Sequence, residues 1–258
     1  MIRISQLKLP VTHKKSDLEK KIYTTLKISS SDLLTWHIEK KSLDARKKPE
    51  LFYSYVVNVQ VKNQAAVLKR KPKNTIPFEK KLYRLPSPLK ESPSRRPVII
   101  GSGPAGLFAG LVLARLGCRP ILLERGDSVE TRQKKVDLFW NTGVLDPESN
   151  VQFGEGGAGT FSDGKLNTLV KDPFGRNREV LRIFAEAGAP EEILYVNKPH
   201  IGTDILIEVI QNLRKEICAL GGEVRFFSQV TDLDITDGKL TGLTINNEEK
   251  TAADVVVL

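Results

Sequence analysis

Residues 97–125 read PVIIGSGPAGLFAGLVLARLGCRPILLER, and this stretch decides the fold of the region around it. Val98–Ile100 is a short apolar run that predicts a strand, and Leu107–Leu116 continues with apolar residues at helical spacing. Ile121–Leu123 predicts a second strand, which ends at Glu124. The strand and the helix are joined by a G-x-G-x-x-G motif made of Gly101, Ser102, Gly103, Pro104, Ala105 and Gly106. The order strand, glycine turn, helix, strand is typical of a parallel α/β sheet.

The glycine motif predicts a dinucleotide-binding site, because each position has a physical role there. Gly101 permits the tight turn, Gly103 lets a pyrophosphate approach the main chain, and Gly106 allows helix and strand to pack closely. The helix N-terminus offers unpaired N–H groups and the positive end of its dipole to the phosphates. Glu124 can accept hydrogen bonds from ribose hydroxyls, and its charge disfavours a 2′-phosphate. The alternative interpretation is a glycine turn with a structural role only.

Composition indicates an ordinary globular protein. The 258 residues are 40% hydrophobic and 28% charged, a length that predicts two domains or one large one. No run is long enough to span a bilayer, and the N-terminus lacks the apolar core of a signal peptide. The two cysteines, Cys118 and Cys218, give no disulfide framework or CxxC pair, and we expect both to be buried. These features predict a cytoplasmic protein without a membrane partner.

Charge is distributed unevenly along the chain. Through Arg96 there are 23 Lys+Arg and 8 Asp+Glu, a balance of +15, whereas the whole chain carries +9. The lysines often stand in pairs, which include Lys47-Lys48 and Lys80-Lys81. Such asymmetry indicates an anionic partner for the first region.

Residues 1–85 predict a small basic α/β module, ferredoxin-like or similar. Strands are expected at Ile2–Leu9, His37–Asp44 and Leu51–Val61, and helices at 16–26, from Ser29, and at Ala65–Lys71. Residues 86–97, PSPLKESPSRRP, contain four prolines and three serines and are interpreted as a linker.

Residues 98–258 predict the nucleotide-binding domain. Helices are expected at Val129–Trp140, Arg176–Ala187 and Asp204–Leu220, strands at Val224–Val230 and Ala252–Leu258, and a hairpin over Thr231–Asn246 turning at Asp237-Gly238. Because the chain stops on an apolar strand, we expect a truncated domain of a longer protein.

Three further segments narrow the interpretation. Phe139–Thr168, Asn197–Leu206 and Ser42–Tyr55 are similar to a bacterial family of uncharacterised FAD-dependent or NAD(FAD)-utilising dehydrogenases, and residues 97–125 resemble the FAD fingerprint of the glutathione-reductase-like flavoproteins. The resemblance covers essentially the whole chain. It implies a Rossmann-like domain with non-covalent FAD, NADH or NADPH as electron donor, and an unidentified small-molecule substrate. Ala253–Leu258 resembles the start of the family's second FAD strand, without the glycine turn that usually follows.

The resemblance also implies site residues. The residues of the glycine motif, Gly101 to Gly106, would contact the pyrophosphate, Glu124 with Arg125 would hold the adenosine ribose, and the main chain of Val230 would contact the adenine. The flavin and ribityl chain would meet a glycine-rich segment, through Gly154, Gly156, Gly157, Ala158, Gly159 and Thr160.

Residues 151–170 can also be interpreted without the resemblance. Glycines at this density allow positive φ and close approach of main chain to a ligand, although a flexible surface loop is the alternative. Lys165 could stabilise an anionic reduced flavin, or be a solvated lysine. His200 could donate a proton, or be a structural histidine. These two are the weak catalytic candidates, and no metal-ligand spacing is present.

The basic module allows a second hypothesis. Tyr53 and Tyr55 alternate on one strand among lysines, and exposed aromatics on a basic sheet could bind single-stranded RNA, which would make the protein an RNA-modifying or RNA-binding flavoprotein. The alternative is a solvated lysine-rich surface with both tyrosines in the core. A third hypothesis is an inactive fragment or a structural nucleotide-binding protein. The sequence leaves the oligomeric state open.

Overall fold

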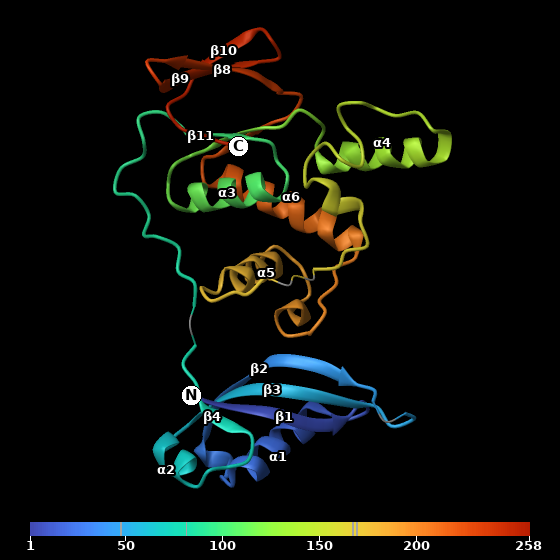
Figure 1. The fold of residues 1–258 in the computed structure, drawn as a ribbon, viewed down its shortest axis with the longest axis vertical. Helices are drawn as coiled ribbons and strands as arrows, with labels where there is room; N and C mark the ends of the chain where they lie inside the picture. Colours follow the sequence, from blue (N-terminus) through green and yellow to red (C-terminus); the bar gives the residue numbers. More distant parts are fainter. Residues whose placement is uncertain (47, 81, 167, 169) are drawn as a thin grey trace. The chain divides into compact units, whose positions relative to one another are not determined.

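The computed structural model describes residues 1–46, 48–80, 82–166, 168 and 170–258 (Figure 1). Lys47 and Lys81, two members of the lysine pairs, and two positions of the 151–170 segment lie outside the described residues. The chain divides into two compact units. The first unit contains residues 1–83, 166–182 and 190–199, and the second contains residues 84–165, 183–189 and 200–258.

The first unit is built on an antiparallel sheet with the strand order β2-β3-β1-β4. Its connectivity over the first 77 residues is β-α-β-β-α-β, with a 3-10 turn before the second strand. The elements are β1 (Ile2–Pro10), α1 (Lys15–Leu26), η1 (Ser30–Asp32), β2 (Leu33–Asp44), β3 (Phe52–Val61), α2 (Gln64–Lys69) and β4 (Thr75–Pro77).

The core of the first unit lies between the sheet and α1. Alternate residues of β1 and β3 meet the apolar stripe of α1, which is formed by Leu18, Ile22 and Leu26. Tyr55 is 3% exposed within this core, and Tyr53 packs against it. Tyr55 is therefore a core residue, as the alternative interpretation expected, and has no face open to a nucleic-acid base, whereas Tyr53 is only partly buried.

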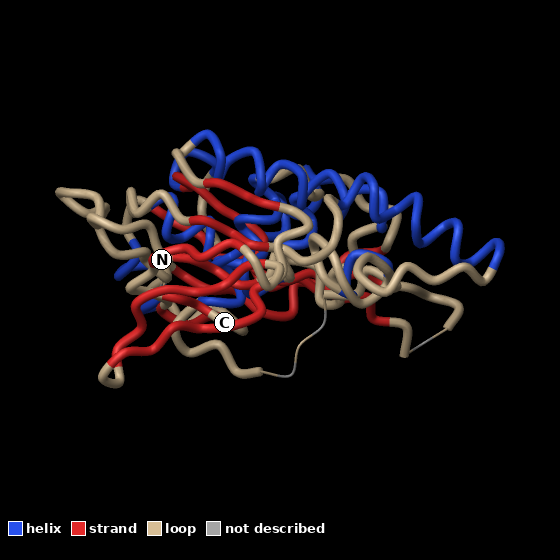
Figure 2. The backbone as a smooth tube through the Cα atoms, turned by 90° about the horizontal axis from the view of Figure 1, so that it is seen from above, coloured by secondary structure: helices blue, strands red, loops and turns tan. Residues whose placement is uncertain are grey.

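The second unit contains a parallel sheet with the order β11-β5-β6-β7 and an antiparallel meander with the order β10-β9-β8. Figure 2 shows how helices and strands follow one another along the backbone. The strands are β5 (Val98–Ile100), β6 (Ile121–Leu123), β7 (Glu223–Arg225), β8 (Val230–Thr236), β9 (Lys239–Ile245), β10 (Glu249–Ala252) and β11 (Val256–Val257). The helices that follow β5 in the chain are α3 (Pro104–Arg115), α4 (Val129–Thr142), η2 (Ala158–Phe161), α5 (Arg176–Glu186), η3 (Glu191–Leu194) and α6 (Thr203–Ala219). Of these, α5 begins in the first unit and η3 lies within the first unit.

Close packing of α3 on the parallel sheet depends on a glycine. A Cβ atom at Gly110 would lie 2.8 Å from Leu122 Cδ1 and 3.3 Å from Ile217 Cδ1, so only a glycine lets α3 approach both β6 and α6 this closely. The helix α6 buries four residues of the apolar stripe predicted from its sequence, Leu206, Ile210, Leu213 and Ile217, together with Val209. Leu220, the fifth residue of the predicted stripe, lies at the end of the helix and is exposed.

Two predicted strands are wrong in extent. The run Val224–Val230 is two strands, because β7 ends at Arg225 and Phe227 has a φ of +53°, which turns the chain out of the parallel sheet before β8 begins. In the run Ala252–Leu258, Ala252 is the last residue of β10, and only Val256–Val257 form a further strand, the short β11. Cys218 is exposed rather than buried, because it lies off the buried stripe of α6, whereas Cys118 is buried as expected.

The hairpin prediction is confirmed. β8 and β9 pair around Asp237-Gly238, and both turn residues have positive φ, at +50° and +73°, as a tight hairpin turn requires. The strands β4 and β10 had no counterpart in the predictions. Within the described residues, no helix has both the length and the hydropathy needed to cross a bilayer.

Candidate nucleotide-binding site

The glycine motif forms a tight turn from β5 into α3. The N–H of Gly101 donates to the carbonyl of Leu123 at 2.7 Å, and Gly101 has a φ of +90°, a conformation that favours glycine. Gly103 is the N-cap of α3, and Pro104 takes the first helical position, where a missing N–H costs nothing. A Cβ at Gly106 would lie 1.9 Å from the Gly101 carbonyl oxygen. The N-terminus of α3 is bare, because no side-chain hydrogen bond caps it.

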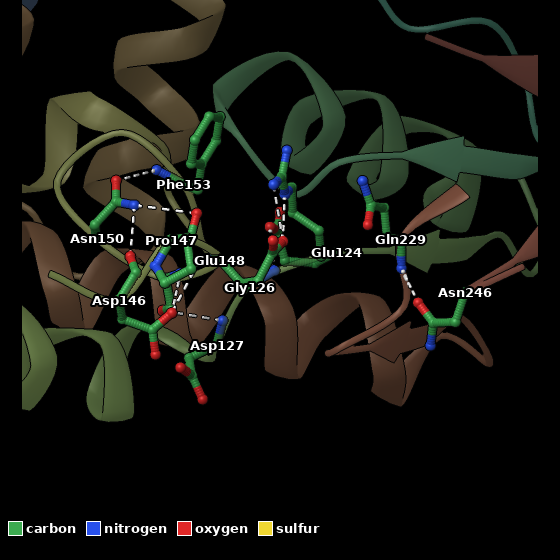
Figure 3. A network of polar contacts seen from close by, with 12 residues as sticks. Glu124, Gly126, Asp127, Asp146, Pro147, Glu148, Asn150, Phe153, Gln229 and Asn246 are labelled. Carbon is green, nitrogen blue, oxygen red and sulfur yellow. Dashed lines mark hydrogen bonds and ion pairs between the residues drawn. The ribbon is translucent and has the colours of Figure 1, made fainter. Parts of the chain in front are cut away.

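Glu124 holds this turn through its carboxylate. It is 4% exposed, and its Oε2 accepts hydrogen bonds from the main-chain N–H and the hydroxyl of Ser102, both at 2.8 Å. Its Oε1 accepts from the N–H of Gly126 at 2.9 Å, as Figure 3 shows. A carboxylate can accept about four hydrogen bonds, so this carboxylate has capacity left for a ligand hydroxyl.

The glycine-rich segment packs against the same turn. The N–H of Gly156 donates to the Ser102 carbonyl at 2.9 Å. A Cβ at Gly157, which has a φ of +65°, would lie 2.9 Å from Pro104 Cδ. These two glycines bring residues 154–157 beside the first turn of α3.

The segment between β7 and β8 lies beside Glu124. The N–H of Ser228 donates to the main-chain carbonyl of Glu124 at 2.8 Å, which brings Val230 to the same edge of the sheet. Asn246 fixes this approach, because its Oδ1 accepts from the N–H of Gln229 at 2.9 Å and its Nδ2 donates to the Phe227 carbonyl at 2.8 Å (Figure 3).

These segments enclose a cavity of about 190 Å³, which we call the motif cavity. Its lining brings together seven of the predicted cofactor residues, namely Gly101, Gly103, Glu124, Arg125, Gly154, Gly157 and Val230. The remaining predicted residues lie outside the lining, namely Ser102, Pro104, Ala105, Gly106, Gly156, Ala158, Gly159 and Thr160.

Phe153 lines the motif cavity, and Glu148 and Asn150, which lie outside the lining, support the part of the wall that contains Arg125. The guanidinium of Arg125 pairs with Glu148 at 2.8 Å and lies 4.3 Å from the centre of the Phe153 ring. Asn150 holds this wall in place, because its Oδ1 accepts from the N–H groups of Gln152 and Phe153 and its Nδ2 donates to the Asp146 carbonyl (Figure 3). Phe153, Asn150 and Glu148 were not predicted as site residues.

Arg132 was also missed, and it organises the glycine-rich segment. It is 0% exposed, and its guanidinium donates to main-chain carbonyls at 2.7–3.4 Å. Burial lowers the pKa of Arg132 to about 10, so it remains a cation at neutral pH. Its signal in the sequence was a charged residue on the apolar face that Val129 and Val136 define. The carbonyls that it binds are those of Asn150, Val151, Gly154, Glu155 and Gly157.

Glu155 is a second buried charge in the segment. Its Oε2 accepts from the N–H of Val129 at 2.8 Å and pairs with Arg214 at 2.7 Å, whereas its Oε1 has no hydrogen-bond partner in the described structure. Burial raises the pKa of Glu155 to about 7, against the lowering effects of the Val129 N–H and Arg214. The sequence signal was an acid flanked by glycines, GEGG.

The weak catalytic candidates lie outside the motif cavity. Lys165 is exposed and pairs with Asp163 at 2.6 Å, an arrangement that matches the solvated-lysine interpretation. His200 is exposed and forms a β-bridge with Lys165. Among the described residues, no group of three or more His, Cys, Asp or Glu side chains is placed to hold a metal ion.

Residues 96–144 match the model of the family described as FAD binding domain. Residues 1–60 match a domain of unknown function, DUF8436. The chain is 45% identical over 258 residues to an uncharacterized protein of Clostridium beijerinckii, and the alignment covers 99% of the chain and 48% of that protein. The chain thus spans about half the length of this curated relative.

Solved structures show weaker similarity. THI4 of Thermovibrio ammonificans has a TM-score of 0.35 at 21% identity, over 58% of this chain and 47% of that one. Glycine oxidase of Bacillus cereus has a TM-score of 0.33 at 15% identity, over 62% and 53%. L-Proline dehydrogenase of P. horikoshii has 0.34 at 13% identity, over 64% and 52%. These similarities are too weak to assign a fold or a function.

Proposed function

We propose that this chain binds FAD non-covalently and is the cofactor-binding part of an FAD-dependent oxidoreductase. The observation that supports this most strongly is the motif cavity, which joins the bare N-terminus of α3 to the buried carboxylate of Glu124. The match of residues 96–144 to the FAD binding domain family supports the same ligand. The second unit is then a Rossmann-like domain, and the first unit is a ferredoxin-like module.

The residues at the cavity fit the ADP half of FAD. A Cβ at Gly103 would meet no protein atom within 4 Å, so the space above this glycine is open to a pyrophosphate. The N–H groups of the first turn of α3 would donate to the phosphates. Glu124 would accept from the ribose hydroxyls, and the main chain at Val230 would face the adenine. We place the flavin end near Gly154 and Gly157, at the other side of the cavity.

Bound FAD supplies a flavin ring that accepts and returns a hydride. This chain's residues would fix the cofactor and exclude water from its phosphates. We propose NADH or NADPH as the electron donor and an unidentified small molecule as substrate, since the resemblance implies a nicotinamide-dependent dehydrogenase. We also propose that the protein is located in the cytoplasm.

The experiment is a titration of the flavin-free chain with FAD, followed by flavin absorbance and fluorescence. We expect saturable one-to-one binding that Gly103→Val weakens by about tenfold or more, because the added side chain fills the space for the pyrophosphate. The matched control is Gly202→Val. Gly202 is also a helix N-cap with extended backbone, lies outside the motif cavity, and would meet only the mobile carboxylate of Asp204.

A folded Gly103→Val variant that binds FAD as tightly as the unsubstituted chain would reject the motif cavity as the site. Circular dichroism of both variants verifies folding before each titration.

A further inference from the structure

The first unit contains a basic cavity of about 480 Å³ that the proposed flavin chemistry does not use. It lies where α1 and α2 end beside β1. Among the described residues that line it, none is acidic and none is aromatic. Five of the lining residues are cations, namely Lys21, Lys27, Arg70, Lys71 and Lys73.

The charge in the basic cavity is only partly balanced by the protein, because the carboxylate of Asp32 interacts electrostatically with Arg70. None of the five cations forms an ion pair with a carboxylate among the described residues. The C-termini of α1 and α2 each contribute about half a negative charge by the helix dipole, against five formal positive charges. With the charge of Asp32 also counted, an excess of about three positive charges is left around one concave surface. An anion with several charges is the ligand that such a surface attracts.

The backbone holds several of these side chains in place. Lys27 and Lys71 have φ of +52° and +48°, and Gln6 and Asn74, which also line the cavity, have +59° and +57°. Such conformations cost about 1 kcal/mol or more for a residue other than glycine and cluster at functional sites. Arg70 is fixed as well, because its Nη1 donates to the Lys27 carbonyl at 3.0 Å.

Helix capping accounts for only part of this arrangement. A lysine at the end of a helix interacts favourably with the dipole, which is sufficient reason for one cation at each helix end. It does not account for Lys21, one turn inside α1, or for Lys73, which follows α2. It also does not account for left-handed lysines where glycine is the residue of lowest cost.

We propose that the basic cavity binds an oligophosphate group, meaning two or more linked phosphates on a small molecule. Its volume lies within the range of small-ligand sites. Its lack of aromatic side chains means that it can bind phosphates but cannot stack bases, which separates it from single-stranded nucleic-acid sites. The amides of Gln6 and Asn74 add uncharged hydrogen-bond donors at its wall.

The test measures inorganic tripolyphosphate binding to the full chain by calorimetry. The double variant Lys21→Gln/Lys71→Gln removes two cations that line the cavity. The control, Lys20→Gln/Lys69→Gln, removes two exposed cations that lie outside the lining, one next to Lys21 in α1 and one at the end of α2, two residues before Lys71. Both variants change the net charge equally, so general attraction to anions changes equally in both.

We expect the unsubstituted chain to bind one tripolyphosphate saturably. The cavity variant should bind about tenfold more weakly or worse, since two charge-assisted hydrogen bonds are lost, and the control should stay within about twofold. Equal weakening in both variants would show diffuse attraction and overturn the proposal. The proposal would also be overturned if the chain bound no tripolyphosphate but did bind a single-stranded oligonucleotide that tripolyphosphate could not displace. Both variants are first verified by thermal unfolding.

Discussion

Glu155 carries a buried carboxyl group whose charge is costly in the folded chain. One oxygen lacks a partner, and Arg214, its ion-pair partner, is shared with the more exposed Glu130. The pKa of Glu155 rises from 4.5 to about 7 on burial. Between these two values the folded chain binds a proton that the unfolded chain has released, so the free energy of unfolding decreases as pH rises.

We predict that Glu155→Gln removes this decrease. The unsubstituted chain should lose stability between pH 4.5 and about 7, by at most about 1.4 kcal/mol per pH unit. The amide does not titrate, so the variant should have a flatter profile across that window. Denaturant unfolding at several pH values measures the difference.

Glu130→Gln is the control for Glu155. Burial raises the pKa of Glu130, but the hydrogen bond and charge of Arg214, together with hydrogen bonds from the main chain and Ser128, outweigh it, so the pKa is lowered in the net. The stabilising contribution of Glu130 is therefore retained above pH 4.5, and the slope between pH 4.5 and 7 should persist. Parallel pH profiles for the unsubstituted chain and Glu155→Gln would contradict the role given to Glu155.

Residue-level expectations succeeded where one residue type is sterically required. Gly106 was expected at a close approach of helix and strand, and the 1.9 Å contact at its Cβ position bears out that packing role. Arg132 and Glu155 were not foreseen, because their roles arise from carbonyls and charges that only the folded chain brings together. Charged residues in apolar or glycine-rich surroundings were the available signal for both.

At the scale of elements, α4 is tied to the glycine-rich segment through one side chain. Arg132→Met should lower the free energy of unfolding by about 3 kcal/mol or more, because several carbonyls lose the charged hydrogen-bond donor that Arg132 provides. Limited proteolysis should then cut residues 150–157 first. Denaturant unfolding and mapping of the cleaved peptides test both expectations.

Lys134→Met on the same helix is the matched control, since Lys134 is exposed and should change stability by less than about 0.5 kcal/mol. Equal stability of the Arg132 and Lys134 variants would show that the carbonyls find other donors and that Arg132 does not organise the segment.

Element boundaries were predictable where periodicity was long and less so where the chain turns within an apolar run. α6 and the hairpin at Asp237-Gly238 follow from their patterns. The residues Val224–Val230 look like one strand, because nothing in the run itself reveals that Phe227 takes a left-handed conformation. That turn is stabilised by Asn246, the residue that follows β9, which a local pattern cannot include.

At the scale of the whole molecule, composition along the chain could not reveal how distant segments assemble. The N–H of Lys41 donates to the Tyr195 carbonyl at 2.7 Å, and the N–H of Asn197 donates to the Lys41 carbonyl at 3.0 Å. Residues 195–197, which belong to the first unit, therefore pair with the outer edge of strand β2. A linker rich in proline and serine indicates where two domains can separate, but not that a later segment returns to the first.

Two units with separate ligands should respond to those ligands separately. A ligand at about 100 times its dissociation constant stabilises the folded state by about 2.7 kcal/mol. We predict that FAD slows amide hydrogen exchange in β5, β6 and the first turn of α3, whereas tripolyphosphate slows it at the ends of α1 and α2. Hydrogen exchange with mass spectrometry on the full chain measures both in one experiment. If FAD slowed hydrogen exchange in the first unit as strongly as in the second, the motif cavity could not be the only site that binds FAD. If neither ligand changed exchange in its own unit, both assignments would be wrong, since binding to a folded unit must slow its opening.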